Sequence, residues 1–264
     1  MVNHHDFGDS IVKCGVSYRL AGSAGRPTLV LANSLGTDSR LWSQQVGMWA
    51  DEYSIVCFEY PGHGSPEWQG ERTMKAYAQR LASLLAALGI KEYFYCGLSM
   101  GGAIGMELAL LDAIRMRKLV LSNTAAVFGP REFWADRGAT AMTHGVAALA
   151  DATLARWFTS EFAADHADVV DFARSMLTAV ERRGYAACCD AIGRFDFRER
   201  LGEIAQPTLV IAGSHDLATT ADQAASLAEA IQGSTYMELG TAHLGNLGAP
   251  EAFASVVGSF LQAA

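Results

Sequence analysis

The chain has 264 residues, half of them hydrophobic, which suits one α/β domain with an insertion or two small domains. Its net charge is −8 and it has no block of basic residues, so nucleic acid and anionic membrane surfaces are not expected as partners. No apolar stretch reaches the roughly 20 residues that a bilayer-spanning helix needs, so we expect no membrane partner.

The amino-terminal residues and the cysteines bear on the compartment. Residues 1–6 are polar and lack the charged-then-apolar pattern of a signal peptide. The chain has five cysteines, an odd number, and Cys57 and Cys96 fall in predicted buried strands. These features predict reduced thiols in a cytoplasmic protein. Cys188 and Cys189 lack a second pair or a histidine cluster nearby, so a packed helix face is favoured over a redox or metal site, and no metal is expected.

Strand and helix patterns alternate along most of the chain. Residues 28–32 form a continuous apolar run, which is typical of a strand covered on both faces. Gly89 follows an amphipathic segment and is a helix stop signal. Strands are predicted over residues 10–20, as an antiparallel edge, and over residues 28–32, 54–58, 93–96, 118–122, 208–212 and 235–239. Helices are predicted over residues 41–49, 73–88, 103–111, 221–231 and 250–261.

This alternation predicts an α/β fold with a mostly parallel, doubly wound sheet, whose ligands bind at the carboxyl ends of the strands. One region interrupts the alternation. Residues 129–200 contain no convincing strand, only helix-period segments such as 147–158 and 169–180. We therefore predict a core formed by residues 1–127 and 198–264, with residues 128–197 inserted as a helical cap over the edge of the sheet.

A serine lies between a predicted strand and the next helix, in the sequence Gly97-Leu98-Ser99-Met100-Gly101. A G-x-S-x-G pattern in that context is the nucleophile elbow of the α/β-hydrolase fold. The bend is so tight that side chains at positions 97 and 101 would collide, and the following helix points its positive dipole end at the serine oxygen. A glycine-rich turn with a solvated serine is the alternative, which the strand–turn–helix context disfavours.

A serine nucleophile needs a base, and His243 is the candidate. In this fold the catalytic groups follow the order serine, acid, histidine. His243 follows the last predicted strand, in a loop that can reach Ser99. His63 precedes the serine and lies between two glycines, so it is interpreted as a turn former rather than a catalyst. The other histidines are terminal, within the predicted cap or beside the expected acid: His4, His5, His144, His166 and His215.

The acid that orients the histidine is expected after the strand at 208–212. That loop reads Gly-Ser-His-Asp, so Asp216 is the candidate, although a solvated turn aspartate is the alternative. Some proteins of this fold place the acid one strand earlier, but Asn123 occupies that position here and carries no charge. Asp190 and Asp196 fall in the predicted cap or at its end.

An oxyanion hole needs two backbone donors in this fold. One follows the nucleophile directly, and the other comes from the loop after the strand at 28–32. The N–H groups of Met100 and Leu35 fill these positions. Ser34 lies in the same loop, either as a second contact through its hydroxyl or only as a turn residue.

At these residues the chain resembles the 3-oxoadipate enol-lactonases of the β-ketoadipate pathway of aromatic catabolism, within the α/β-hydrolase superfamily. The resemblance covers most of the chain, the predicted cap included, and the cap segments are the more specific part because the triad alone also fits esterases, C–C hydrolases and cofactor-free haloperoxidases. The matching segments are residues 33–37, 96–102, 122–126, 156–159, 184–186 with Cys188, 191–192, 213–216, and 242–244 with Asn246.

The resemblance implies hydrolysis of 3-oxoadipate enol-lactone to 3-oxoadipate through an acyl-enzyme on Ser99, with no metal or organic cofactor. The carboxylate of such a substrate would need a local positive site, because a net charge of −8 steers anions away. Candidate anchors are the cap arginines Arg131, Arg137, Arg156 and Arg194, and candidate pocket walls are Trp134 and Trp157. An arginine on a solvated helix face or a tryptophan packed between cap and core is the alternative at each position.

Two other functions stay open on the sequence alone. A carboxylesterase, or a hydrolase of another lactone or of a C–C bond in aromatic breakdown, would share the triad and differ in the cap pocket. A ligand-binding protein that keeps the fold without catalysis would belong to another class, although no member of the predicted triad is missing.

Overall fold

The computed structural model describes residues 7–65 and 70–263, which form one eight-stranded sheet in the order β1-β2-β4-β3-β5-β6-β7-β8. The pairs β1–β2 and β2–β4 are antiparallel, and all other neighbouring pairs are parallel. The strands are β1 (Ile11–Lys13), β2 (Val16–Gly22), β3 (Thr28–Ala32), β4 (Ser54–Phe58), β5 (Tyr93–Leu98), β6 (Met116–Ser122), β7 (Thr208–Gly213) and β8 (Thr235–Leu239).

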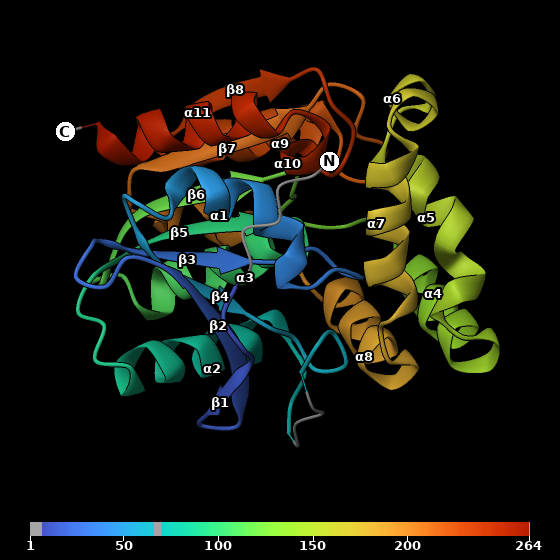
Figure 1. Ribbon diagram of the computed structural model, residues 1–264, viewed down its shortest axis with the longest axis horizontal. Helices are drawn as coiled ribbons and strands as arrows, with labels where there is room; N and C mark the ends of the chain where they lie inside the picture. The colour runs from blue at the N-terminus through green and yellow to red at the C-terminus, as the bar shows by residue number, and fades with distance from the viewer. Residues whose placement is uncertain (1–6, 66–69, 264) are drawn as a thin grey trace.

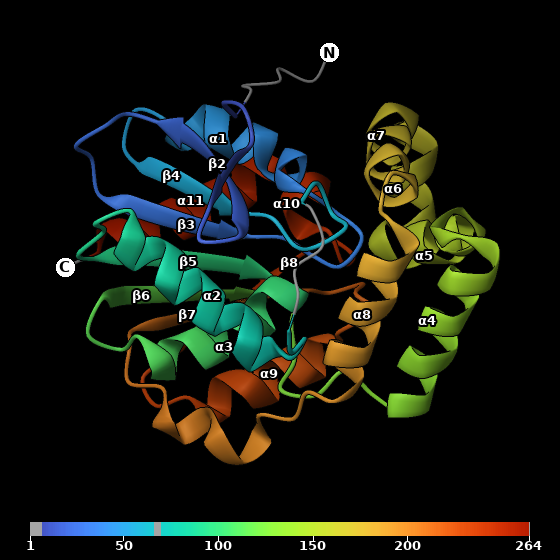
Figure 2. The same cartoon turned by 90° about the horizontal axis from the view of Figure 1, so that it is seen from below.

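Helices cover both faces of this sheet, which makes it doubly wound as predicted (Figure 2). One face carries α2 (Met74–Ala87), α3 (Met100–Leu111) and α9 (Ala221–Ala230), and the other carries α1 (Ser43–Trp49) and α11 (Pro250–Gln262). Three shorter helices complete this part: η1 (Ser39–Trp42), η3 (Arg198–Glu203) and α10 (Gly245–Gly248). The central strands are almost fully buried because both of their faces are covered.

The predicted elements agree with the structure, with differences at their ends. The strands expected at 28–32, 54–58 and 235–239 have those bounds, whereas β5 continues to Leu98 and so reaches the residue before Ser99. The helix expected over 41–49 begins as the separate 3₁₀ turn η1, because the Asp38 side chain accepts a hydrogen bond from the N–H of Arg40 and caps it.

A separate layer of helices lies beside the sheet, and the arrow of β3 points toward it (Figure 1). The layer comprises α4 (Arg131–His144), η2 (Val146–Leu149), α5 (Ala150–Trp157), α6 (Ser160–Asp165), α7 (Ala167–Thr178) and α8 (Arg182–Gly193). The chain leaves the sheet and returns at one place, where Val127 bridges Asp196 and the N–H of Phe197 donates to Ala126 O over 2.9 Å. We call residues 128–197 the cap, and the division into two domains stays a prediction.

The structure also shows the state of the cysteines and the lengths of the apolar helices. Cys57, Cys96, Cys188 and Cys189 are buried, Cys14 is exposed, and none forms a disulfide. Among the described residues, no helix has the length and apolar character that crossing a membrane requires. Residues 1–6, from which the lack of a signal peptide was predicted and which hold His4 and His5, lie outside the described residues.

Candidate active site

Ser99 lies at the bend between β5 and α3 with strained backbone angles of φ 57° and ψ −112°. The bend is closely packed. A Cβ atom on Gly97 would overlap the backbone of Gly101, and one on Gly101 would overlap the carbonyl of Ala32. The N–H of Ser99 donates to Ser122 O over 2.9 Å, which fixes the bend against β6. The two glycines therefore permit the turn that presents Ser99 at the start of α3.

His243 and Asp216 meet at the same end of the sheet. The Asp216 Oδ2 and His243 Nδ1 atoms are 2.8 Å apart, and both residues are buried, with 4% and 3% of their surface exposed. Asp216 follows β7 and His243 follows β8, so two parallel strands deliver the pair.

The carboxylate of Asp216 is held by further donors. Oδ1 accepts the N–H groups of Ala218 at 2.7 Å and Thr219 at 3.0 Å, and Oδ2 accepts the Thr219 hydroxyl at 2.9 Å and the Asn123 amide at 3.0 Å. Burial by itself raises the pKa of Asp216, but the charge of His243 and these hydrogen bonds outweigh it, so the pKa lies below its ordinary value. Asp216 is thus kept ionised beside the imidazole.

The two amides expected to form an oxyanion hole flank the serine. Met100 is the first residue of α3, and Leu35 lies in the loop after β3. Within the described chain neither N–H donates to a protein acceptor. The N–H of Gly101 donates to Asn33 O over 3.0 Å and joins this loop to the elbow. Both amides therefore lack a protein acceptor among the described residues, as donors of an oxyanion hole would.

Ser99, His243, Ser34 and Leu35 line one cavity of about 50 Å³. Ala218 and Thr219 of the loop after β7 line it as well, and the cap supplies the remaining wall through Phe128, Trp134, Arg137, Thr153, Arg156, Trp157 and Ile192. The serine and the histidine thus line the same cavity, and the cap forms its opposite wall.

Known proteins are similar to this chain in sequence and in fold. A model of the alpha/beta hydrolase family matches residues 29–256. 3-Oxoadipate enol-lactonase 2 of Acinetobacter baylyi is 34% identical over 239 residues, which cover 90% of each chain. The crystal structure of the enol-lactonase from Burkholderia xenovorans LB400 superposes with a TM-score of 0.93 at 37% identity, covering 97% of this chain and 100% of that one.

The chain belongs to the 3-oxoadipate enol-lactonase family of α/β-hydrolases. It is therefore an ester or lactone hydrolase. A further solved structure, a hydrolase from Pseudomonas aeruginosa PA01, is 33% identical with a TM-score of 0.92 and covers 99% of this chain and 100% of that one.

Two arginines of this hydrolase lie on the cap wall of the Ser99 cavity, and both are half-buried. Arg137 donates to the hydroxyls of Tyr185 at 2.9 Å and Thr153 at 2.6 Å. The Arg156 guanidinium lies 5.0 Å from the ring centre of Phe133. Among residues 7–65 and 70–263, neither arginine has a carboxylate partner. The wall thus carries two arginines that form no ion pair with any acid of the described residues.

Of the other residues expected to contact the substrate, two line the cavity and two do not. Trp134 and Trp157 line the cavity, and Trp157 O accepts the N–H of Leu244, next to His243, over 3.2 Å. Arg131 is exposed on α4, and Arg194 is exposed in an ion pair with Asp190. Neither is among the residues that line the cavity, so the structure gives no support to these two as anchors.

Sequence reasoning missed two residues that hold the acid. Asn123 has φ 47°, and its amide donates to both Asp216 and Ala242 O, while its own oxygen accepts the Ser122 hydroxyl over 2.7 Å. Thr219 donates to Asp216 through both N–H and hydroxyl. Asn123 was visible as the residue in the alternative acid position, whereas no pattern marked Thr219.

His63 lies away from the cavity of Ser99. It is buried between Tyr60 and Tyr185, and its Nδ1 is 3.1 Å from Pro61 O. Burial lowers the pKa of His63 to about 4. A second cavity of about 510 Å³ is lined by His63 together with Glu59, but by neither Ser99 nor His243. We therefore take the smaller cavity as the candidate active site.

Proposed function

We propose that this hydrolase opens 3-oxoadipate enol-lactone to 3-oxoadipate through an acyl-enzyme on Ser99. Membership in the enol-lactonase family supports the reaction class. One observation supports this choice of substrate. Arg137 and Arg156 lie, without carboxylate partners among the described residues, on the wall of the cavity that contains Ser99 and His243. An anionic lactone supplies the missing negative charge.

In the acylation step, Ser99 Oγ attacks the lactone carbonyl and its proton passes to Nε2 of His243. Asp216, bound to the other ring nitrogen, orients the imidazole and stabilises its positive charge. The N–H groups of Leu35 and Met100 donate to the oxyanion, and the amino-terminal end of α3 adds its dipole. The ring C–O bond then breaks and leaves an acyl-enzyme.

The leaving group is an enolate of the same molecule, which is more stable than an ordinary alkoxide. It takes the proton back from His243 and tautomerises to a ketone, so the ring does not close again. A water molecule gives a proton to His243 and attacks the acyl carbonyl, and the second tetrahedral intermediate releases the acid and restores Ser99.

The cap arginines bind the substrate's carboxylate in this scheme. The net charge of −8 repels an anion at long range, so attraction has to be local. Guanidinium groups bind carboxylates through charge-assisted hydrogen bonds, which are stronger in a partly buried site. Within the part of the chain that the structure describes, Arg156 donates no hydrogen bond, whereas Arg137 already donates to Tyr185 and Thr153.

The size of the cavity adds a structural requirement. A volume of about 50 Å³ is well below the roughly 150 Å³ that accommodates a benzene ring. A lactone therefore enters only if side chains or helices of the cap wall move outward. The catalytic groups need no such movement, because strands and the elbow hold them.

Steady-state kinetics with two lactones test the proposal. The wild-type enzyme is given 3-oxoadipate enol-lactone and an enol-lactone with the same ring but no carboxylate. We expect kcat/KM to be higher for the anionic lactone by about 100-fold, the value of one or two charge-assisted hydrogen bonds. Equal values, or faster turnover of p-nitrophenyl acetate than of either lactone, would instead support a general carboxylesterase.

A further inference from the structure

We propose that Glu59 is a positioning residue that holds the loop of residues 33–39, here called the oxyanion loop, in the shape that presents the Leu35 N–H to the reacting oxygen. The inference rests on the proposed function, which assigns Leu35 to the oxyanion hole. Glu59 follows β4 and lies outside the cavity that contains Ser99.

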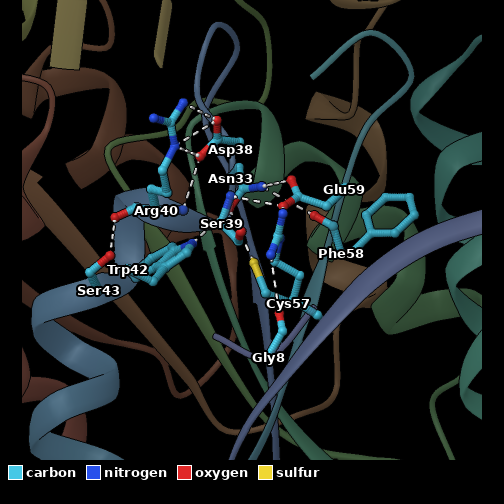
Figure 3. A network of polar contacts seen from close by, with 11 residues as sticks. Gly8, Asn33, Asp38, Ser39, Arg40, Trp42, Ser43, Cys57, Phe58 and Glu59 are labelled. Atoms are coloured by element: carbon cyan, nitrogen blue, oxygen red, sulfur yellow. Dashed lines mark hydrogen bonds and ion pairs between the residues drawn. The ribbon is translucent and has the colours of Figure 1, made fainter. Parts of the chain in front are cut away.

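The carboxyl group of Glu59 joins the two ends of the oxyanion loop (Figure 3). Its Oε2 atom accepts the side-chain amide of Asn33 at 3.2 Å, and its Oε1 atom accepts the N–H of Ser39 at 3.1 Å. Leu35 lies between these two residues in the chain. One side chain of the neighbouring strand end therefore fixes both the start and the end of the segment that carries the donor.

The orientation of Asn33 is fixed by its other partners. Its Oδ1 atom accepts the indole N–H of Trp42 at 2.9 Å and the thiol of Cys57 at 3.4 Å. An indole N–H can only donate, so Oδ1 must face Trp42 and the amide NH₂ must face Glu59. The NH₂ group also donates to Phe58 O at 3.2 Å, so one of its two hydrogens is left for an acceptor at position 59.

The same residue connects the loop to the elbow. The carbonyl of Asn33 accepts the N–H of Gly101 at 3.0 Å and the hydroxyl of Tyr60 at 2.6 Å. Further along, Ser34 O accepts the N–H of Thr37 at 3.2 Å and its hydroxyl at 2.9 Å, which closes a turn around Leu35. We therefore expect a change at Glu59 to displace Asn33, and with it both Leu35 in the same loop and Met100, which precedes Gly101.

Glu59 is costly to bury, which supports a role beyond packing. It is 1% exposed, and the nearest cation, the Arg19 Nε atom, is 3.6 Å from Oε1. Burial raises the pKa of Glu59 from 4.5 to about 7, against the hydrogen bonds of Ser39, which lower it. Carboxyl groups whose pKa is shifted this far from the ordinary value are found mostly at functional sites.

Two substitutions test the role. Glu59→Gln keeps the shape but turns an NH₂ group toward either Asn33 or Ser39, both of which donate, so one bond of the pair is lost. Glu59→Met removes both acceptors and also the buried charge, so it should fold even if the glutamine variant does not. Glu107→Gln is the matched control, because Glu107 is also buried and, among the described residues, its carboxylate bonds only Arg200, at 3.2 Å, away from the loop.

The readouts separate positioning from stability. For each variant that unfolds cooperatively, kcat and KM are measured with p-nitrophenyl acetate, and Kd with phenylboronic acid, which forms a tetrahedral adduct with the serine. We expect kcat to fall about 10- to 100-fold and boronate affinity to weaken by a similar factor, with KM within about threefold. Glu107→Gln should change kcat less than about twofold.

Folded Glu59 variants whose kcat and boronate affinity stay within about twofold of the wild type would overturn the inference. The aryl ester makes this test independent of the substrate assignment, since it needs no carboxylate contact. Failure of the proposed nucleophile would be seen separately, as unchanged aryl-ester hydrolysis in Ser99→Ala. The two failures are therefore distinguishable.

Discussion

The two walls of the candidate active site are built differently. On the sheet side, the Asp216 carboxylate accepts five hydrogen bonds, and the Glu59 carboxyl accepts one hydrogen bond from each end of the oxyanion loop. On the cap side, the Arg156 guanidinium contacts one aromatic ring, and Arg137 bonds two hydroxyls. The difference indicates that the sheet edge fixes the positions of the catalytic groups, whereas the cap wall adjusts to the substrate.

Removal of the nucleophile should have the largest effect. In Ser99→Ala we expect turnover of every ester and lactone to fall by about 10⁴-fold or more, because no other group forms the acyl-enzyme. The melting temperature should stay close to that of the wild type, since alanine is smaller and the bend is retained. A fluorophosphonate should label the wild-type enzyme once, at Ser99. Absence of this labelling would favour a non-catalytic binding protein.

Loss of the acid's charge should come next. Asp216→Asn places an NH₂ group among donors and favours the wrong tautomer of His243, so we expect kcat to fall by about 10³- to 10⁴-fold for anionic and neutral substrates alike. Asp190→Asn, at an exposed position of the cap, is the control and should leave kcat unchanged. A tenfold loss or less in Asp216→Asn would show that another group orients the imidazole.

Changes on the cap wall should act on one class of substrate only. Arg156→Met and Arg137→Met should each raise KM for 3-oxoadipate enol-lactone by about 10- to 100-fold and leave hydrolysis of p-nitrophenyl acetate within about threefold. Arg131→Met, an exposed arginine outside the cavity lining, is the matched control. Equal losses on both substrates would contradict the division between the walls.

A buried histidine near the sheet edge should affect stability rather than activity. The pKa of His63 is lowered from 6.5 to about 4, so between these values the unfolded chain binds a proton that the folded protein does not. The titration of His63 therefore lowers the free energy of unfolding as the pH falls, by about 3 kcal/mol in total. This effect opposes that of Glu59, whose raised pKa makes stability fall as the pH rises from 4.5 to about 7.

Comparison with His63→Phe isolates the histidine, because Glu59 is common to both proteins. The difference in unfolding free energy between the wild type and the variant should shift by about 3 kcal/mol between pH 7.5 and pH 4, to the disadvantage of the wild type at low pH. Denaturant titrations across this range would measure it. A difference that does not change with pH would mean that the pKa of His63 is the same in the folded and the unfolded protein.

Much of the fold was predictable because its signals are local. The apolar run 28–32 is a strand with those bounds, and the elbow is recognisable because only glycine fits at 97 and 101. The pairing of Asp216 with His243 followed from the order of groups along the chain and from the fact that parallel strands end at one edge. These inferences needed no knowledge of side-chain packing.

Contacts between distant segments were not predictable in the same way. Arg131 and Arg137 lie on the same helix, and only the packing of α4 against α8 decides which of them lines the cavity. Glu59 carried no signal either, because its partners Asn33 and Ser39 come from a different loop. Such relations depend on how elements meet, which a periodic pattern does not encode.

A crystal structure of Ser99→Ala with bound 3-oxoadipate enol-lactone would test the division between the two walls most directly. We expect the lactone carbonyl oxygen about 3 Å from the N–H groups of Leu35 and Met100, and the substrate carboxylate about 3 Å from the guanidinium of Arg156 or Arg137. A carboxylate that faces solvent or the sheet edge, or a carbonyl oxygen turned away from both amides, would contradict the account.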